Sequence, residues 1–345
     1  MIRFRVVALS VTAAAFGTVA LLGRAEPKST AGRMQLAAGR FLASLSPQLR
    51  AKATFDFTDP HRTRWFFTPQ QDEQKRYTRK GVRLEEMTAE QKAAALELLR
   101  SGLSATGFET ALGIISLEAL LKELEGDRGQ MVRNTGWYFV SVFGEPTPTG
   151  RWGWRFEGHH LSVNYTLDKG EVIASSPILF GVNPAEVKAG EKKGLRLVAG
   201  IEDRARDLIA SLSPEQMKLA KQPHHFPEIK EGQANADVGQ PVGITADRLT
   251  AEQRTMLAKL LAAYTDRMPE DLAAVEARRA ADTPPDKLYF AYSGSPQPGQ
   301  PYTYRVYAPS FVVEFLNVQA DSAKNPANHI HSVWRRLPAD FGLAE

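Results

Sequence analysis

The chain has 345 residues, of which 43% are hydrophobic and 24% are charged, and it contains no cysteine. This composition is typical of a globular protein with a substantial core, and it excludes disulfides, thiolate nucleophiles and cysteine-ligated zinc. The formal net charge is +4, but residues 1–25 contain Arg3, Arg5 and Arg24 and no acid. The remainder carries only 4 − 3 = +1, so we expect no nucleic-acid partner.

Residues 1–25 have the pattern of a secretory signal peptide. The short basic start Met1–Arg5 is followed by an uncharged run of apolar and small residues as far as Gly23, and Gly23 and Ala25 suit cleavage before Glu26. The alternative is a retained anchor, because about 18 apolar residues can just span a bilayer. We expect cleavage, and therefore an exported protein, periplasmic or extracellular, whose mature chain has no membrane span.

The first part of the mature chain is predicted to be helical. Apolar residues at helical spacing predict a helix over residues 31–52, interrupted at Ser46-Pro47. A capping-box pattern at Thr88–Gln91 predicts a helix to about Leu103, and a similar pattern at Thr106–Glu109 predicts another to about residue 125.

Beyond Gly136 the period of the apolar residues changes to two. Residues 137–143, 152–167 and 171–175 are therefore predicted strands, followed by an irregular segment, 177–184. Helical character returns at residues 201–212.

The second half of the sequence resembles the first. The matched segments, in chain order, are Leu42–Pro47 with Ile209–Pro214, Met87–Gln91 with Leu249–Gln253, Tyr138–Pro146 with Tyr289–Pro296, and Trp152–Phe156 with Tyr302–Val306. Helices followed by strands, twice, predict an α+β fold. The fold is predicted to consist of two related units, residues 26–200 and 201–345. Each unit has helices followed by an antiparallel hairpin, and the two pack as one pseudo-twofold domain. Residues 221–242 are predicted to be a surface connection. The alternative is that two helices and a hairpin simply occur twice.

The stretch Trp152–Asn164 combines aromatic and polar residues with a pair of histidines. Alternation along one continuous strand places His160, Ser162 and Asn164 on the face away from the core, and it places Trp154 on the same side. We therefore predict that Trp154, Ser162 and Asn164 bind a ligand beside His160.

A second histidine pair lies near the C-terminus. In an extended segment, His329 and His331 point the same way. If pseudo-twofold packing brings them beside His160, three imidazoles with Asn164 or Glu314 can hold a divalent ion, zinc or manganese, and leave one position for water. Such an ion acidifies the bound water and makes a nucleophile for hydrolysis. The candidate catalytic bases are Glu157 and Glu314.

Asn328 and Arg335 flank the second histidine pair and are further candidates for ligand binding. The leading interpretation is thus a metal-dependent hydrolase. Two alternatives stay open. The histidines could be hydrogen-bonded structural residues, or the protein could be a non-enzymatic binding protein that uses its aromatic and histidine side chains for a small polar molecule or saccharide.

Both histidine segments belong to a larger pattern that includes Pro177–Pro184 and Asp340–Gly342. This pattern, with its Gly-His-His and Asn-His-Ile-His motifs, resembles the bacterial domain of unknown function 3500 family over nearly the whole mature chain. The resemblance implies an often exported protein and implies no particular activity. The chain departs from the family pattern at Arg336, where an acidic residue commonly follows the arginine, and at Leu316, where an aspartate often precedes Asn317.

Overall fold

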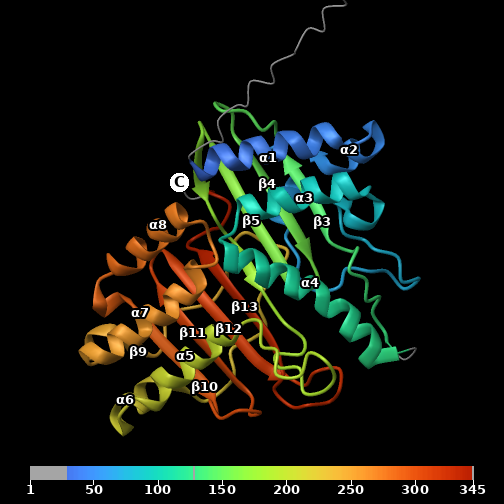
Figure 1. Ribbon diagram of the computed structural model, residues 1–345. Helices are drawn as coiled ribbons and strands as arrows, with labels where there is room; N and C mark the ends of the chain where they lie inside the picture. Colours follow the sequence, from blue (N-terminus) through green and yellow to red (C-terminus); the bar gives the residue numbers. More distant parts are fainter. Residues whose placement is uncertain (1–28, 127–128, 344–345) are drawn as a thin grey trace, which may run out of the picture.

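The structure is a computed structural model that describes residues 29–126 and 129–343. The predicted signal peptide, residues 1–25, lies outside the described residues. In the described ranges the chain has a mixed α+β fold with eight α-helices and a large, mostly antiparallel sheet, which confirms the predicted class (Figure 1). In these same ranges, no helix is long and apolar enough to cross a membrane.

Two helices begin where the sequence predicts, and in both a side chain caps the first turn. Ser46 caps a helix that starts at Pro47, and Thr88 with Gln91 forms the predicted capping box. The second predicted capping position is wrong, because Ser104 rather than Thr106 accepts the N–H of Gly107. The helices are α1 (Thr30–Ser44), α2 (Pro47–Ala53), α3 (Ala89–Ser101), α4 (Ala105–Glu125), α5 (Ala199–Ala210), α6 (Pro214–Ala220), α7 (Ala251–Thr265) and α8 (Glu270–Ala281), with short 3-10 turns η1 (Pro60–Thr63), η2 (Leu84–Glu86), η4 (Ala246–Arg248) and η5 (Pro285–Lys287).

The strands form a single sheet in the order β1-β3-β4-β5-β7-β13-β12-β11-β10-β8, with β2 beside β3, β6 beside β5 and β9 beside β10. The antiparallel pair β7 and β13 joins the strands of the first half to those of the second. The strands are β1 (Thr54–Phe55), β2 (Val82–Arg83), β3 (Phe139–Phe143), β4 (Trp152–Gly158), β5 (Leu161–Asp168), β6 (Glu171–Ala174), β7 (Ile178–Phe180), β8 (Lys221–Gln222), β9 (Ile244–Thr245), β10 (Tyr289–Gly294), β11 (Tyr302–Ala308), β12 (Phe311–Gln319) and β13 (His329–Arg336).

The predicted strand over residues 152–167 is two strands, β4 and β5, joined by a tight turn at His159 and His160. Trp154 pairs with Tyr165 across the hairpin, and directly paired residues share one face of an antiparallel sheet. Trp154 therefore lies on the core side, where its ring stacks on Tyr165 at 5.1 Å. Its predicted place on the face of Ser162 is wrong, because the turn reverses the alternation that a continuous strand would have kept.

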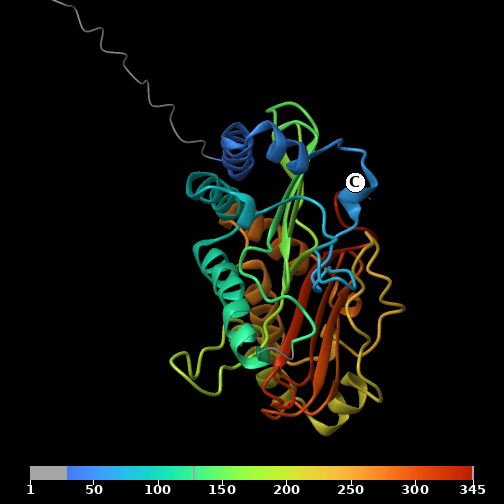
Figure 2. The same ribbon diagram turned by 90° about the vertical axis from the view of Figure 1, so that its right-hand side faces the viewer.

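The two faces of the sheet are covered differently. Helices pack on one face and form the main core, whereas irregular segments around residues 56–81 and 223–243 cover the other face (Figure 2). Beneath these segments is a second, smaller core made of Trp65, Phe67, Leu179, Ile229, Leu316, Val333 and Phe341. Because Ile229 is buried in it, the segment predicted as a surface connection also packs against the sheet.

Candidate metal centre

Three histidines meet beside the central strands of the sheet. His160 occupies the turn between β4 and β5, and His329 and His331 lie two positions apart at the start of β13, on the same side of that strand. The Nε2 atom of His160 is 2.8 Å from Nε2 of His329 and 3.1 Å from Nε2 of His331. All three potential ligand atoms lie within 4.8 Å of one another. The predicted histidine cluster is therefore present.

The turn holds His160 in an unusual backbone conformation. Its φ is +62°, in the left-handed region that residues other than glycine seldom occupy. The backbone N–H of His160 donates to the carbonyl of Phe67, and its carbonyl accepts the N–H of Gly181, each at 2.8 Å. A Cβ atom at position 181 would lie 3.1 Å from the His160 ring, so a glycine there lets the chain pass close to the imidazole. Strain that is fixed by its surroundings in this way is typical of functional sites.

An acidic side chain sets the tautomer of His331. Its Nδ1 lies 2.9 Å from Oε1 of Glu228, so Nδ1–H donates to the carboxylate and Nε2 keeps its lone pair. Although partial burial acts to raise the pKa of the Glu228 carboxyl, the contact with His331 outweighs it, and the pKa lies below its usual value. A carboxylate on the outer nitrogen is the arrangement that orients metal-ligating histidines.

One proton cannot serve both close contacts of His160. If its Nε2 carries a proton, that proton can point well at only one of His329 and His331; if it carries none, its lone pair faces that of His331. A cation between the three Nε2 atoms would satisfy all the lone pairs together. Burial, reinforced by the neighbouring histidines, lowers the pKa of His160 and of His329 well below the usual value. The rings of His160 and His329 are thus neutral near pH 7, which is the form that binds metal.

His159 lies outside the cluster and supports it. Its ring stacks on that of His160 with 3.7 Å between centroids, and its Nδ1 lies 2.5 Å from the carboxylate of Glu118 on α4. The phenol of Tyr138 donates to the carbonyl of His159. These contacts hold His159 in place against one face of the His160 ring.

The structure gives the other predicted site residues structural partners. Arg155 donates to Oδ1 of Asn164, whose Nδ2 donates to Ser162 and to the carbonyl of Pro177. Asn328 exchanges two hydrogen bonds with the backbone of Glu186, which fixes the start of β13. The ligand-binding role of Ser162, Asn164 and Asn328 stays a prediction.

Arg335 is fully buried, and its guanidinium is fully engaged. It pairs with Asp340 at 2.7 Å and also donates to the carbonyls of Lys230, Gln233 and Ala234. These partners tie β13 to the segment that covers the second core. Its predicted ligand-binding role likewise stays a prediction.

The two predicted catalytic bases are both paired with arginines. Glu157 accepts the backbone N–H of Phe66 and lies 3.4 Å from both Arg79 and Arg155. Glu314 pairs with Arg305 at 2.7 Å, and burial raises the pKa of its carboxyl. Neither belongs to the group of potential metal ligands formed by the three histidines.

Two residues at the cluster were missed by the sequence reasoning, namely Glu228 and Asn183. Glu228 reaches His331 across 103 positions of sequence, and Nδ2 of Asn183 lies 3.5 Å from Nδ1 of His329. Oδ1 of Asn183 is buried and has no hydrogen-bond partner. Both lie in irregular segments whose positions depend on long-range packing, and the one sign in the sequence was that Asn183 falls within Pro177–Pro184, a segment of the family pattern.

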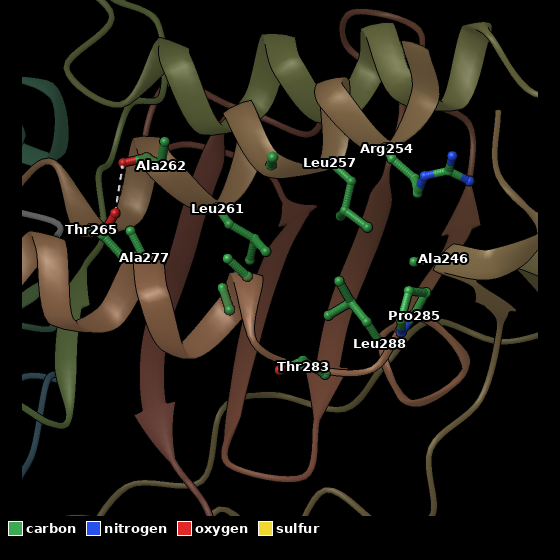
Figure 3. A pocket seen from close by; sticks show the side chains of 13 residues that line it. Ala246, Arg254, Leu257, Leu261, Ala262, Thr265, Ala277, Thr283, Pro285 and Leu288 are labelled. Atoms are coloured by element: carbon green, nitrogen blue, oxygen red, sulfur yellow. Dashed lines mark hydrogen bonds between the residues drawn. The ribbon is translucent and has the colours of Figure 1, made fainter. Parts of the chain in front are cut away.

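A surface hollow of about 670 Å³ adjoins the cluster on the side of His329. Asn183 lines it, together with Arg133, which contacts His159 and pairs with Glu125. A ligand in this hollow would therefore contact Asn183, whose Nδ2 lies 3.5 Å from Nδ1 of His329. A different hollow, of about 260 Å³ between α7 and α8, has a mainly apolar lining with none of the three histidines (Figure 3).

A family model described as protein of unknown function (DUF3500) matches residues 27–343. The chain belongs to this family. The match covers nearly all of the sequence, so both histidine segments of this DUF3500 protein lie inside it. Comparison with curated proteins and with solved structures gave no match.

Proposed function

We propose that this DUF3500 protein holds a divalent metal ion at His160, His329 and His331 and uses it to hydrolyse a small polar substrate. The observation that carries the proposal is the convergence of three Nε2 atoms, one of them backed by the Glu228 carboxylate. Zinc–nitrogen bonds of about 2.0–2.1 Å in tetrahedral geometry require nitrogens about 3.3 Å apart. The contacts of 2.8 and 3.1 Å are near that spacing. Of zinc and manganese, zinc suits three imidazoles better.

Three protein ligands leave the fourth position of a tetrahedral ion open, as in catalytic zinc sites. A bound ion would acidify a water molecule in that position and so supply a nucleophile at neutral pH. Glu228 keeps the lone pair of His331 directed at the ion, and the adjoining hollow, which Asn183 lines, has room for a small polar substrate. The predicted base Glu157 is not needed in this scheme.

The proposal is tested by metal content and hydrolysis together. We expect purified protein to contain about one zinc per chain by mass spectrometry, and to cleave at least one compound in a panel of nitrophenyl esters, phosphates and glycosides. The activity should disappear after a chelator and return with zinc. Metal without any hydrolysis would favour the alternative, a non-enzymatic binding protein for a polar ligand or saccharide. Absence of bound metal after zinc loading would overturn the centre itself.

Glu228 provides a sharper test of the metal centre. Its side chain is 42% exposed, so Glu228→Gln should leave the fold intact, whereas loss of a carboxylate behind a ligating histidine typically weakens metal binding by about 10–100-fold. Zinc affinity measured by competition with a chromophoric chelator checks this. Glu191→Gln, at an exposed position with no partner among the described residues, is the matched control. Equal zinc affinity in both variants would contradict the arrangement.

We also propose that the protein is exported, on the support of the signal-like pattern in residues 1–25. The intact mass of the chain recovered outside the cytoplasm should correspond to a start at Glu26. A chain that keeps residues 1–25 would instead favour the anchor.

Finally, we propose that residues 26–200 and 201–345 are related by duplication about a pseudo-twofold axis. The order of pairing supports this, because β1, β2, β3, β4 and β5 have the same mutual pairing as β8, β9, β10, β11 and β12. Superposition of these two strand sets should align His160 with Ser310. On this proposal the metal centre draws its ligands from both halves, so neither half could hold the ion by itself.

A further inference from the structure

A second polar hollow lies on the helix-free face of the sheet, within the segment 59–80. Its volume is about 540 Å³. Positive side chains outnumber negative ones in its lining, which contains Arg64, Arg79 and Lys80 against Asp59. The hollow shares no lining residue with the hollow beside the histidines.

Buried cations also outnumber buried anions behind this hollow. Arg79 and Arg155 share one buried carboxylate, Glu157. Arg62 is buried as well, and its guanidinium donates to a hydroxyl and a carbonyl without a carboxylate partner among the described residues. Burial, with the nearby charges of Arg151 and Arg155, lowers the pKa of Arg62 to about 10. Burial is the larger cause of this shift, and the repulsion from Arg151 and Arg155 adds to it because these cations make the local potential positive.

Two exposed cations remain available to a ligand, beside the buried imidazole of His61. Arg64 and Lys80 are exposed, and neither side chain has an ion pair within residues 29–126 and 129–343. His61 is 7% exposed, and its Nε2 is buried without a hydrogen-bond partner. Its ring is fixed by Phe55 and Phe143, at centroid distances of 5.1 and 5.7 Å.

We propose that this hollow binds a small oxyanion, a group of the phosphate, sulfate or carboxylate type. The planar fork of Arg64 can engage two oxygens of such a group, and Lys80 adds a second charge at the mouth of the hollow. The oxyanion would also offset the excess of buried guanidinium charge. The site is independent of the proposed metal centre, since it uses none of the three clustered histidines.

Titration calorimetry at constant ionic strength tests this site. Phosphate, sulfate and citrate are each titrated into chelator-treated protein, because phosphate would also bind a metal ion. At least one of them should bind saturably with one site per chain, and their order of affinity distinguishes phosphate-like from carboxylate ligands. The double variant Arg64→Gln/Lys80→Gln should bind at least about tenfold more weakly, since it loses two charge-assisted contacts.

The double variant Arg204→Gln/Lys259→Gln removes the same two charges from exposed positions on α5 and α7 and should bind like the wild type. His160→Ala should also bind normally. The proposal is overturned if none of the three anions binds saturably, or if the helix variant loses as much affinity as the loop variant. It is equally overturned if His160→Ala abolishes binding, because the anion would then occupy the histidine cluster.

Discussion

Replacement of His160 by alanine is expected to weaken zinc binding by on the order of 100-fold or more. Structural zinc sites release about 10–16 kcal/mol over four ligands, or roughly 3 kcal/mol for each. His160 should be at least as important as this average, because its Nε2 lies closest to both other histidines. Zinc affinity by chelator competition, and zinc content after gel filtration, would measure the loss.

His224→Ala is the matched control, since His224 is exposed in the segment that follows β8 and is not part of the cluster. It should bind zinc like the wild type. Thermal unfolding of metal-free protein would separate loss of the site from loss of the fold. A His160→Ala protein that is folded and binds zinc as tightly as the His224→Ala protein would remove the basis of the metal proposal.

Replacement of Arg335 by alanine is expected to destabilise the fold by about 3–5 kcal/mol, because it leaves a buried carboxylate without its partner. Asp340 is fully buried, and Arg335 is its partner at 2.7 Å. The guanidinium also lies 5.2 Å from the ring of Trp65, so its loss would disturb the second core. Arg335→Lys should recover only part of the stability, since an ammonium group cannot reproduce the branched set of donors.

Urea unfolding of the metal-free variants measures this effect. Arg278→Ala, at an exposed position on α8, should change the free energy of unfolding by less than about 0.5 kcal/mol. If Arg335→Ala is as stable as Arg278→Ala, the structural interpretation is wrong, and the predicted ligand-binding role of Arg335 becomes the better one.

The candidate site was predictable in part because its ligands come as recognisable local pairs. A His-x-His pair on a strand necessarily points to one side, and this holds for His329 and His331 whatever the rest of the fold does. That His160 would meet them was a prediction from the similarity of the two halves. The carboxylate found against the cluster, that of Glu228, was not predicted, and the catalytic roles of Glu157 and Glu314 stay predictions.

The error over Trp154 has a simple physical origin. Successive side chains point to opposite faces of a sheet only along an unbroken strand. Beyond a tight turn, the position in the sequence no longer tells which residues share a face. Gly158 is a weak local sign of that turn, because His159 and His160 after it are not typical turn residues. The left-handed backbone at His160 is adopted because its neighbours Phe67 and Gly181 hold it there.

The sequence by itself determined what depends on neighbouring residues. Hydrogen bonds within a few positions start α2 and α3, and the period of the apolar residues separates helices from strands. Only the tertiary structure decided which distant charges meet. Whether a glutamate faces an arginine or a histidine depends on how irregular segments such as 223–243 cross the sheet, and that path follows from burial of side chains such as Ile229 rather than from any local pattern.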